Sequence, residues 1–266
     1  AYLGRTLSVE DYGLLNLAIM IVTIITALST IGMENGLNRY IPYYSGLKDK
    51  KKVGETIYFS AKTTFFISIG LSIFIYVFAE RVAGMFENGF YLAKLLKIFS
   101  ISIPFMAVGN RVFLNCLLYL KYVKQYSLIF NILQNLVRLI LTIILVSIGF
   151  SLFGAGLAYS INAIIIGMLG FYVFNSYYKL KKEKFEDKTD FLRYSMPLFL
   201  VTLIAYLNGW IDTFMVGYLL DNYNVGLYNA ALLTSQLLYL FPGMVLPLMM
   251  PVIGPYFARK QFFEVN

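Results

Sequence analysis

Long apolar runs separated by short polar stretches make up most of the chain. A helix needs about 20 apolar residues to cross the hydrocarbon core of a bilayer, because each residue adds ~1.5 Å along its axis. A closed barrel would need strands of alternating polarity, and no such alternation appears. The pattern therefore predicts an all-α polytopic membrane protein with about seven transmembrane helices, at residues 14–33, 57–79, 92–118, 126–148, 153–174, 192–220 and 225–250.

Composition supports lipid as the solvent. Hydrophobic residues make up 59% of the chain and charged residues only 14%, with a mean hydropathy of +0.70, which leaves too little polar surface to cover a water-soluble globule. The sequence has no His and a single cysteine, Cys116, which excludes an intrachain disulfide and argues against a zinc or haem site. We therefore expect no cofactor and no bound metal.

The net charge of +8 resides mainly in the loops and indicates topology rather than nucleic-acid binding. Alternate loops carry 14 basic residues on one side and 4 on the other. By the positive-inside rule the richer side is cytoplasmic, which places the loop 45–55 and the segment 175–190 inside and residues 81–91 and 221–224 outside. The first set is Lys48, Lys50, Lys51, Lys52, Lys121, Lys124, Lys179, Lys181, Lys182, Lys184, Lys188, Arg193, Arg259 and Lys260; the second is Arg5, Arg81, Lys94 and Lys97.

An internal repeat divides the chain. A displacement of 213 positions without gaps superposes residues 13–18 (GLLNLA) on 226–231 (GLYNAA) and residues 42–44 (PYY) on 255–257 (PYF). A displacement that spans six helices preserves orientation, so we predict parallel lobes related by an axis along the membrane normal. Residues 1–174 would form one lobe, 175–190 a solvated cytoplasmic connector and 191–266 the start of a second lobe.

Two further expectations follow from the sequence. The chain opens with Ala1 rather than Met and its first span already runs inward, so we expect a fragment of a longer protein. Prolines recur every four or five residues at Pro242, Pro247, Pro251 and Pro255, and each removes a helical hydrogen bond. We therefore expect the last predicted helix to be kinked.

Four segments together resemble a known family: residues 2–18 (YLGRTLSVEDYGLLNLA), 32–46 (GMENGLNRYIPYYSG), 153–160 (FGAGLAYS) and 210–231 (WIDTFMVGYLLDNYNVGLYNAA). They are similar to polysaccharide-biosynthesis flippases of the Wzx type, in the multidrug/oligosaccharidyl-lipid/polysaccharide exporter superfamily. The resemblance implies two six-helix lobes around a central cavity and transport by alternating access. It also implies a cytoplasmic-membrane location, with this chain covering the second to the eighth helix.

Charge inside the hydrocarbon region is costly, at about 2.5 to 3.5 kcal/mol on insertion scales, so each such residue is a functional candidate. Basic candidates for the pyrophosphate of a lipid-linked oligosaccharide are Arg111 and Arg138, with Arg39 and Lys62 as weaker members that snorkelling to the interface would also explain. Asp212 is a candidate for ion coupling, against the alternative of a structural pair.

Two other functions stay open from the sequence. A cation-coupled multidrug exporter of the same superfamily should hold acids in its cavity, whereas basic candidates outnumber Asp212 and Glu34 here. A membrane-embedded glycosyltransferase or polymerase should show paired acids or a base in a loop near the interface, and none stands out. No GxxxxGK[ST] motif occurs, so ATP-driven transport is unsupported. The sequence therefore favours a flippase that is not an enzyme.

Overall fold

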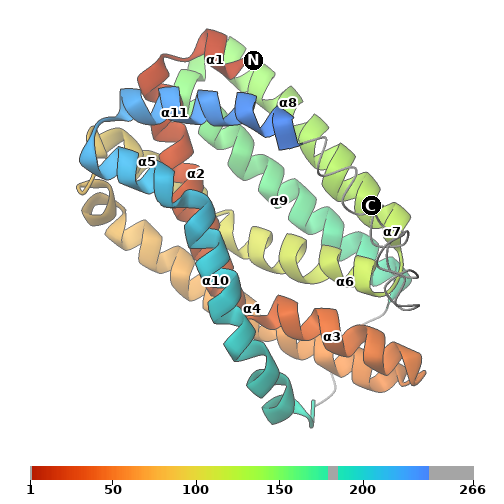
Figure 1. Cartoon of the computed structure of the whole chain (residues 1–266). Coiled ribbons are helices and arrows are strands. Elements are labelled where there is room, and N and C mark those ends of the chain that lie inside the picture. Colours follow the sequence, from red (N-terminus) through yellow and green to blue (C-terminus); the bar gives the residue numbers. More distant parts are fainter. Residues whose placement is uncertain (1, 179–184, 240–266) are drawn as a thin grey trace, which may run out of the picture. The chain divides into compact units, whose positions relative to one another are not determined.

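The computed structural model describes residues 2–178 and 185–239, and their regular structure is helical throughout (Figure 1). This confirms the all-α polytopic membrane fold that the apolar runs predict. The elements are α1 (Leu3–Thr6), α2 (Val9–Thr30), α3 (Met33–Gly46), α4 (Lys50–Ala83), α5 (Gly89–Ser100), η1 (Phe105–Leu114), α6 (Asn115–Tyr119), α7 (Val123–Ser127), η2 (Leu128–Leu133), α8 (Gln134–Leu145), η3 (Val146–Phe150), α9 (Ser151–Tyr177), α10 (Lys188–Leu219), α11 (Asn222–Ser235) and η4 (Gln236–Tyr239).

Within the described ranges, four helical segments are long and apolar enough to cross a membrane: Val9–Thr30, Lys50–Ala83, Val123–Tyr177 and Lys188–Leu219. A fifth span results if Gly89–Ser100 and Phe105–Tyr119, which are bent by 47°, are counted together. The segment Val123–Tyr177 has 55 residues, which as one straight helix would measure about 80 Å, more than twice the hydrocarbon thickness.

That long segment folds back on itself. Gly149 has a φ of 102° and Ser151 a φ of 43°, which interrupts the helix between η3 and α9. The two arms, α8 and α9, then pack against each other (Figure 1). Six of the seven predicted spans thus have a helical counterpart. Of the seventh, 225–250, the structure describes residues 225–239, which belong to α11 and η4. The four prolines expected to kink it lie outside the described residues.

The first predicted helix ends at a sharp break. Ser8 caps α2 by accepting a hydrogen bond from the Asp11 backbone nitrogen at 3.0 Å. Ile31 and Gly32 at the other end have φ angles of 40° and 73°, in the left-handed region where a helix cannot continue. The chain then starts again as α3, which packs along α10.

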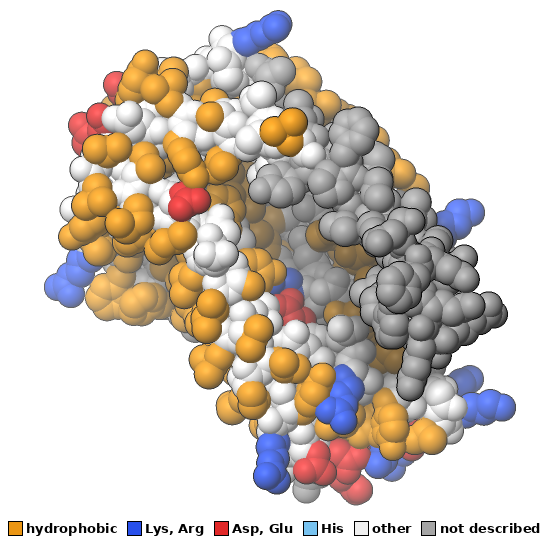
Figure 2. All heavy atoms as spheres, viewed as in Figure 1, with side chains coloured by type: hydrophobic (Ala, Val, Ile, Leu, Met, Phe, Trp, Pro, Cys, Tyr) orange, Lys and Arg blue, Asp and Glu red, His pale blue; other side chains and the backbone are white. Residues whose placement is uncertain are grey.

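Large apolar side chains occupy both the outer surface of the helices and the interior between them. Large apolar residues of α4, α8 and α10 remain exposed, including Phe66, Ile140 and Ile204. Figure 2 shows apolar side chains gathered over the outward surface of α10. Inside, Leu17 and Phe99 belong to one apolar cluster and Ile57 and Phe174 to another, each fully buried. An outward apolar surface of this extent suits hydrocarbon and not water.

Glycines allow the closest helix crossings. A Cβ atom on Gly109 of η1 would collide with the backbone of Gly167 on α9. Small residues at such contacts let membrane helices gain van der Waals packing, which matters because lipid offers little hydrophobic driving force between helices.

Gly13 on α2 and Gly226 on α11 form a second crossing of this kind. A Cβ on Gly13 would collide with the Asn222 carbonyl oxygen, and a Cβ on Gly226 would collide with the Val9 carbonyl oxygen. Gly13 and Gly226 are equivalent under the 213-residue displacement, and so are Val9 and Asn222. Each helix therefore places its glycine against the carbonyl oxygen four residues before the glycine of the other helix.

The loops gather at two ends of the bundle, in the grouping that their charges predict. At one end Asn222 donates from its side chain to the Glu87 carbonyl oxygen at 2.8 Å. At the other end Lys52 donates to the Asp187 carboxylate at 2.7 Å. The direction in which the chain crosses the membrane stays a prediction.

Two predicted loop segments differ from the structure. The loop expected at 45–55 spans only residues 47–49, because Asp49 caps α4 by accepting from the Lys52 backbone nitrogen at 3.0 Å and helix begins at Lys50. The end of the connector 175–190 is not fully solvated: Phe185 is 2% exposed against Phe59 and Phe191, and Asp187 binds Lys52. Residues 179–184 lie outside the described part.

The chain divides into a compact unit of residues 1–226 and a second unit of residues 227–266. In the second unit the structure describes the remainder of α11 and the short 3₁₀ helix η4. The predicted equivalence of residues 42–44 and 255–257 lies outside the described residues.

Candidate functional site

Arg111 lies on η1, a stretch of π-helix in the middle of a bent span. Such stretches widen the helix, lose regular backbone bonding and are frequent at functional sites. The Asn115 side chain donates to the Arg111 carbonyl oxygen at 3.0 Å and satisfies part of the irregular backbone. The sequence therefore places a guanidinium group where the helix is least regular.

The Arg111 guanidinium pairs with Glu34 of α3. Its Nη1 atom lies 3.3 Å from one carboxylate oxygen and 3.5 Å from the other, and both side chains are 15% exposed. Glu34 is in the first turn of α3, where the positive end of the helix dipole favours an acid. Two charges that would each be costly inside the bundle thus neutralise each other.

Tyr206 of α10 completes this group. Arg111 Nη1 donates to the Tyr206 hydroxyl oxygen at 2.7 Å, and the guanidinium carbon lies 4.7 Å from the centre of the Tyr206 ring. The ring face attracts the cation while the hydroxyl accepts its hydrogen bond. We call Arg111, Glu34 and Tyr206 the central cluster.

Polar contacts continue from the central cluster along α3 and α10. Asn35 donates to the Thr202 hydroxyl at 3.0 Å, and the Arg39 guanidinium lies 4.2 Å from the Tyr194 ring centre. A Cβ on Gly36 would collide with the side chain of Ser195, so the two helices touch there. Figure 2 shows charged side chains of both signs in a hollow that borders α10, apart from those on the outer surface.

Arg138 lies on α8 and is exposed, with Nη2 donating to the Asn135 side-chain oxygen at 3.1 Å. Arg138 is therefore on a different element from Arg111, which lies on η1. Their roles toward a substrate stay predictions.

The weaker candidates are more dispersed. Lys62, on α4, is exposed and forms no hydrogen bond or ion pair with another described residue. Arg39 is exposed and stacks on Tyr194. Asp212 is an exposed residue of α10, six residues beyond Tyr206 and thus about 9 Å along the helix.

Sequence reasoning missed several polar residues of the interior. Tyr206 carries no charge, so only the fold identifies it as the partner of Arg111. Polar residues on α8 and just before it recur at the spacing of one helical face: Asn131, Gln134, Asn135, Arg138 and Thr142. This spacing is visible in the sequence and could have identified a polar face of the helix. Asn110 and Gln134 each have a buried side-chain oxygen without a partner among the described residues, which marks polar positions open to a ligand or water.

The arrangement suits the binding of an anion. Among the described residues no group of three His, Cys, Asp or Glu could hold a metal ion. A guanidinium held by one carboxylate and one hydroxyl can exchange the carboxylate for an incoming phosphate, because both anions present two oxygens that can accept from its parallel N–H donors.

Spanning helices with paired charges in their interior are typical of membrane transporters. The family of polysaccharide biosynthesis proteins matches this chain over residues 1–261, and the chain belongs to that family. It is the family of Wzx-type flippases in the multidrug/oligosaccharidyl-lipid/polysaccharide exporter superfamily, which confirms the resemblance of the four segments and supports a transport role in polysaccharide synthesis. Members of the family are generally transporters rather than enzymes.

Comparison with curated proteins and with solved structures gave no match.

Proposed function

We propose that the protein flips a lipid-linked oligosaccharide across the cytoplasmic membrane by alternating access, with Arg111 and Arg138 binding the pyrophosphate. The observation that carries this proposal is the central cluster. Glu34 and Tyr206 hold the Arg111 guanidinium. An entering pyrophosphate takes the place of Glu34, so the cation is never left unpaired inside the membrane.

The same cluster couples binding to movement. Glu34 and Arg111 belong to the predicted first lobe, residues 1–174, whereas Tyr206 belongs to the predicted second lobe, residues 191–266. A phosphate that binds Arg111 weakens the hydrogen bond between Arg111 and Tyr206. One contact between the predicted lobes is then weaker. A ligand can shift a conformational equilibrium only through such a difference in contacts.

The weaker candidates have supporting places in this proposal. Arg39 and Lys62 would attract the anionic headgroup at the inner-leaflet side, since both are exposed and cationic. Asp212 would carry the coupling cation or proton. Replacing it as Asp212→Asn should then reduce the dependence of export on the ion gradient, and unchanged dependence would remove Asp212 from the mechanism.

The test is glycan export by the full-length protein in a strain that lacks its flippase, with variants matched for membrane abundance. Arg111→Ala and Arg138→Ala should each reduce export about tenfold or more, because a hydrogen bond to a charged group contributes about 1.5 to 3 kcal/mol. Arg111→Lys should lose less, since it keeps the charge without the fork. Arg193→Ala removes an exposed arginine of α10 and should export normally.

A double variant separates substrate binding from a purely structural role. If Arg111 serves only to neutralise Glu34, Glu34→Gln/Arg111→Gln should restore export. If Arg111 binds phosphate, that double variant stays deficient although it is folded. Export at the unmutated rate by both Arg111→Ala and Arg138→Ala would overturn the proposal.

A cation-coupled exporter is the second candidate, because Glu34 places an acid in the same cluster. In that case Glu34→Gln should abolish transport and Arg111→Gln should not. The flippase proposal expects the reverse order of severity.

A further inference from the structure

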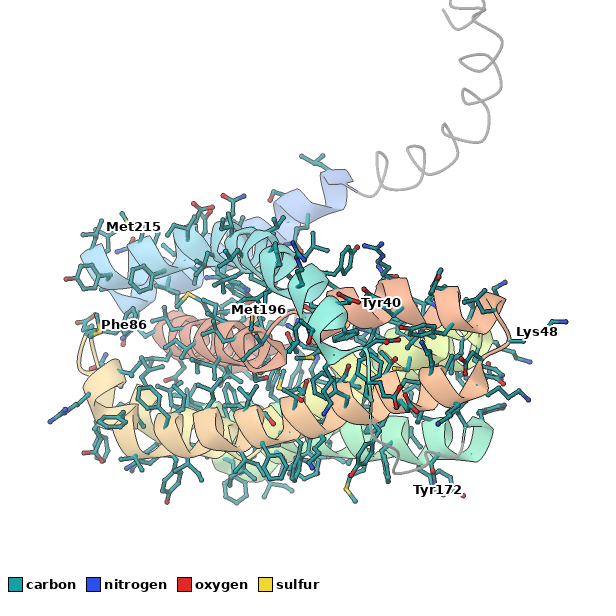
Figure 3. All side chains as sticks on the ribbon, turned by 90° about the horizontal axis from the view of Figure 1, so that it is seen from below. Tyr40, Lys48, Phe86, Tyr172, Met196 and Met215 are labelled. Atoms are coloured by element: carbon teal, nitrogen blue, oxygen red, sulfur yellow. The ribbon has the colours of Figure 1, made fainter. Side chains whose placement is uncertain are left out.

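A cavity of about 810 Å³ lies at the end of the bundle that carries the turn between α3 and α4. Its wall combines Lys48 of that turn and Lys50 and Lys51 of the first turn of α4 with tyrosines near the ends of neighbouring helices, Tyr122, Tyr177 and Tyr178. We call it the lysine–tyrosine pocket. Figure 3 shows Lys48 at this end of the molecule.

The pocket has an excess of positive charge. One acid, Glu55, is part of the wall, and its carboxylate lies 3.7 Å from the Lys51 ammonium. Among the described residues no acid pairs with Lys48 or Lys50. The neighbouring Asp49 accepts from the Lys52 backbone as the cap of α4. Two ammonium groups are therefore available to an anion.

The tyrosine side of the wall is built from fixed contacts. The Tyr178 hydroxyl donates to the Lys50 carbonyl oxygen, which ties the end of α9 to the start of α4. The rings of Tyr122 and Tyr177 lie 4.7 Å apart between centres, and Gln125 donates to the Tyr177 hydroxyl at 3.0 Å. Gly54 leaves room for Tyr178, since an added Cβ would lie 3.4 Å from its hydroxyl oxygen.

The residue types in the pocket wall are those typical of the headgroup layer. Tyrosine is enriched where hydrocarbon meets water, and lysines at helix ends extend into the same layer. The loop charges predict that this end is cytoplasmic, the side on which basic pockets between membrane helices bind anionic lipid headgroups. Leu47 and Val123, which are next in sequence to the wall residues Lys48 and Tyr122, are exposed apolar side chains that would contact the acyl chains.

We propose that the lysine–tyrosine pocket binds the phosphate headgroup of an anionic phospholipid. This site is distinct from the central cluster: Glu34 and Ser45, a residue of the pocket wall, are separated by eleven residues of α3, or about 16 Å. The inference does not depend on what the protein transports. Lys48 and Lys50 would bind the phosphate, and the tyrosine hydroxyls would contact the glycerol region.

The test measures thermal unfolding of the full-length protein in detergent with added lipid, which requires no transport. Phosphatidylglycerol should raise the unfolding midpoint more than phosphatidylcholine does. The variant Lys48→Gln/Lys50→Gln should need at least tenfold more phosphatidylglycerol for the same rise, since each lysine near a lipid surface contributes roughly fivefold in affinity. Lys48→Arg/Lys50→Arg should retain the response.

The matched control is Lys121→Gln/Lys124→Gln. It removes the same charge at the same end, from residues that do not line the pocket. Lys121 and Lys48 also share a left-handed backbone conformation, with φ angles of 69° and 57°. The control should respond as the unmutated protein does.

Three outcomes decide the proposal. If both double variants lose the response to phosphatidylglycerol equally, the response comes from surface charge in general and not from the pocket. If the two lipids raise the unfolding midpoint equally, the protein does not select the headgroup. Either result overturns the proposal. Inorganic phosphate, added alone at the same concentration, distinguishes the sources. A response as large as that to phosphatidylglycerol would assign the pocket to free phosphate and overturn the lipid assignment.

Discussion

Gly13 and Gly226 meet where α2 and α11 cross, and each lies against the carbonyl group found four residues before the other glycine. The two positions are 213 residues apart, and the same displacement relates Val9 to Asn222, the residues that supply those carbonyls. A contact repeated in both directions is what a two-fold axis between equivalent helices produces. The duplication of whole lobes stays a prediction.

The first prediction concerns this crossing. Gly13→Ala and Gly226→Ala should each lower the thermal unfolding midpoint by several degrees, because the added methyl group forces the two helices apart. Gly70→Ala on α4 is the control, since its Cβ would meet no atom within 4 Å. Alanine favours helix there and should leave the midpoint unchanged or raise it. Unchanged midpoints in both crossing variants would contradict the close packing.

The second prediction concerns the Arg111–Glu34 pair. Arg111→Gln leaves the Glu34 carboxylate only 15% exposed and without its cation, which should destabilise the protein by about 3 kcal/mol. Glu34→Gln should cost a similar amount for the opposite reason. The double variant should recover much of the loss, because no unpaired charge remains. Chemical or thermal unfolding of the three variants measures the coupling, and additive losses would show that the pair is not coupled.

The third prediction is a pH dependence at Asp187. The hydrogen bond from Lys52, together with that from the Tyr44 hydroxyl, lowers the pKa of the Asp187 carboxyl. A lowered folded-state pKa stabilises the protein above the unfolded value of about 3.9 and loses that effect as pH falls through the folded value. Asp187→Asn should therefore lower the unfolding midpoint by roughly one to three degrees at pH 7.

At pH 3 the difference between Asp187→Asn and the unmutated protein should shrink. Glu186→Gln, at the adjacent exposed acid, should have little effect at either pH. A difference that stays constant from pH 7 to pH 3 would mean that the Asp187 carboxylate charge is not what stabilises this end of the bundle.

The fourth prediction is the orientation in the membrane. In a Cys116→Ser background, cysteines at Lys51 and Asn88 occupy exposed positions at opposite ends of α4. An impermeant thiol reagent applied to intact cells should label Asn88→Cys and not Lys51→Cys. Replacing Cys116 removes the one native thiol of the sequence, so labelling reports only the introduced cysteine. Stronger labelling at position 51 would reverse the topology.

Apolar periodicity and charge determined the class of this protein without any coordinates. Each span was readable because lipid forces about 20 consecutive residues to be apolar, a local requirement that one stretch of sequence meets alone. The family was likewise readable from helix-end motifs such as residues 2–18. The depth of Arg111 and Arg138 in their spans followed from counting residues.

The tertiary structure alone decided the partners of those residues. That Arg111 meets both Glu34 and Tyr206, 77 and 95 residues away, depends on how α3, η1 and α10 pack. The lysine–tyrosine pocket likewise joins residues 48–55 to Tyr122 and Tyr178 through helices distant in sequence. Apolar periodicity predicts which face of each helix is buried but not which helix packs against that face. In lipid that choice comes from close van der Waals packing and polar contacts, which no single span contains.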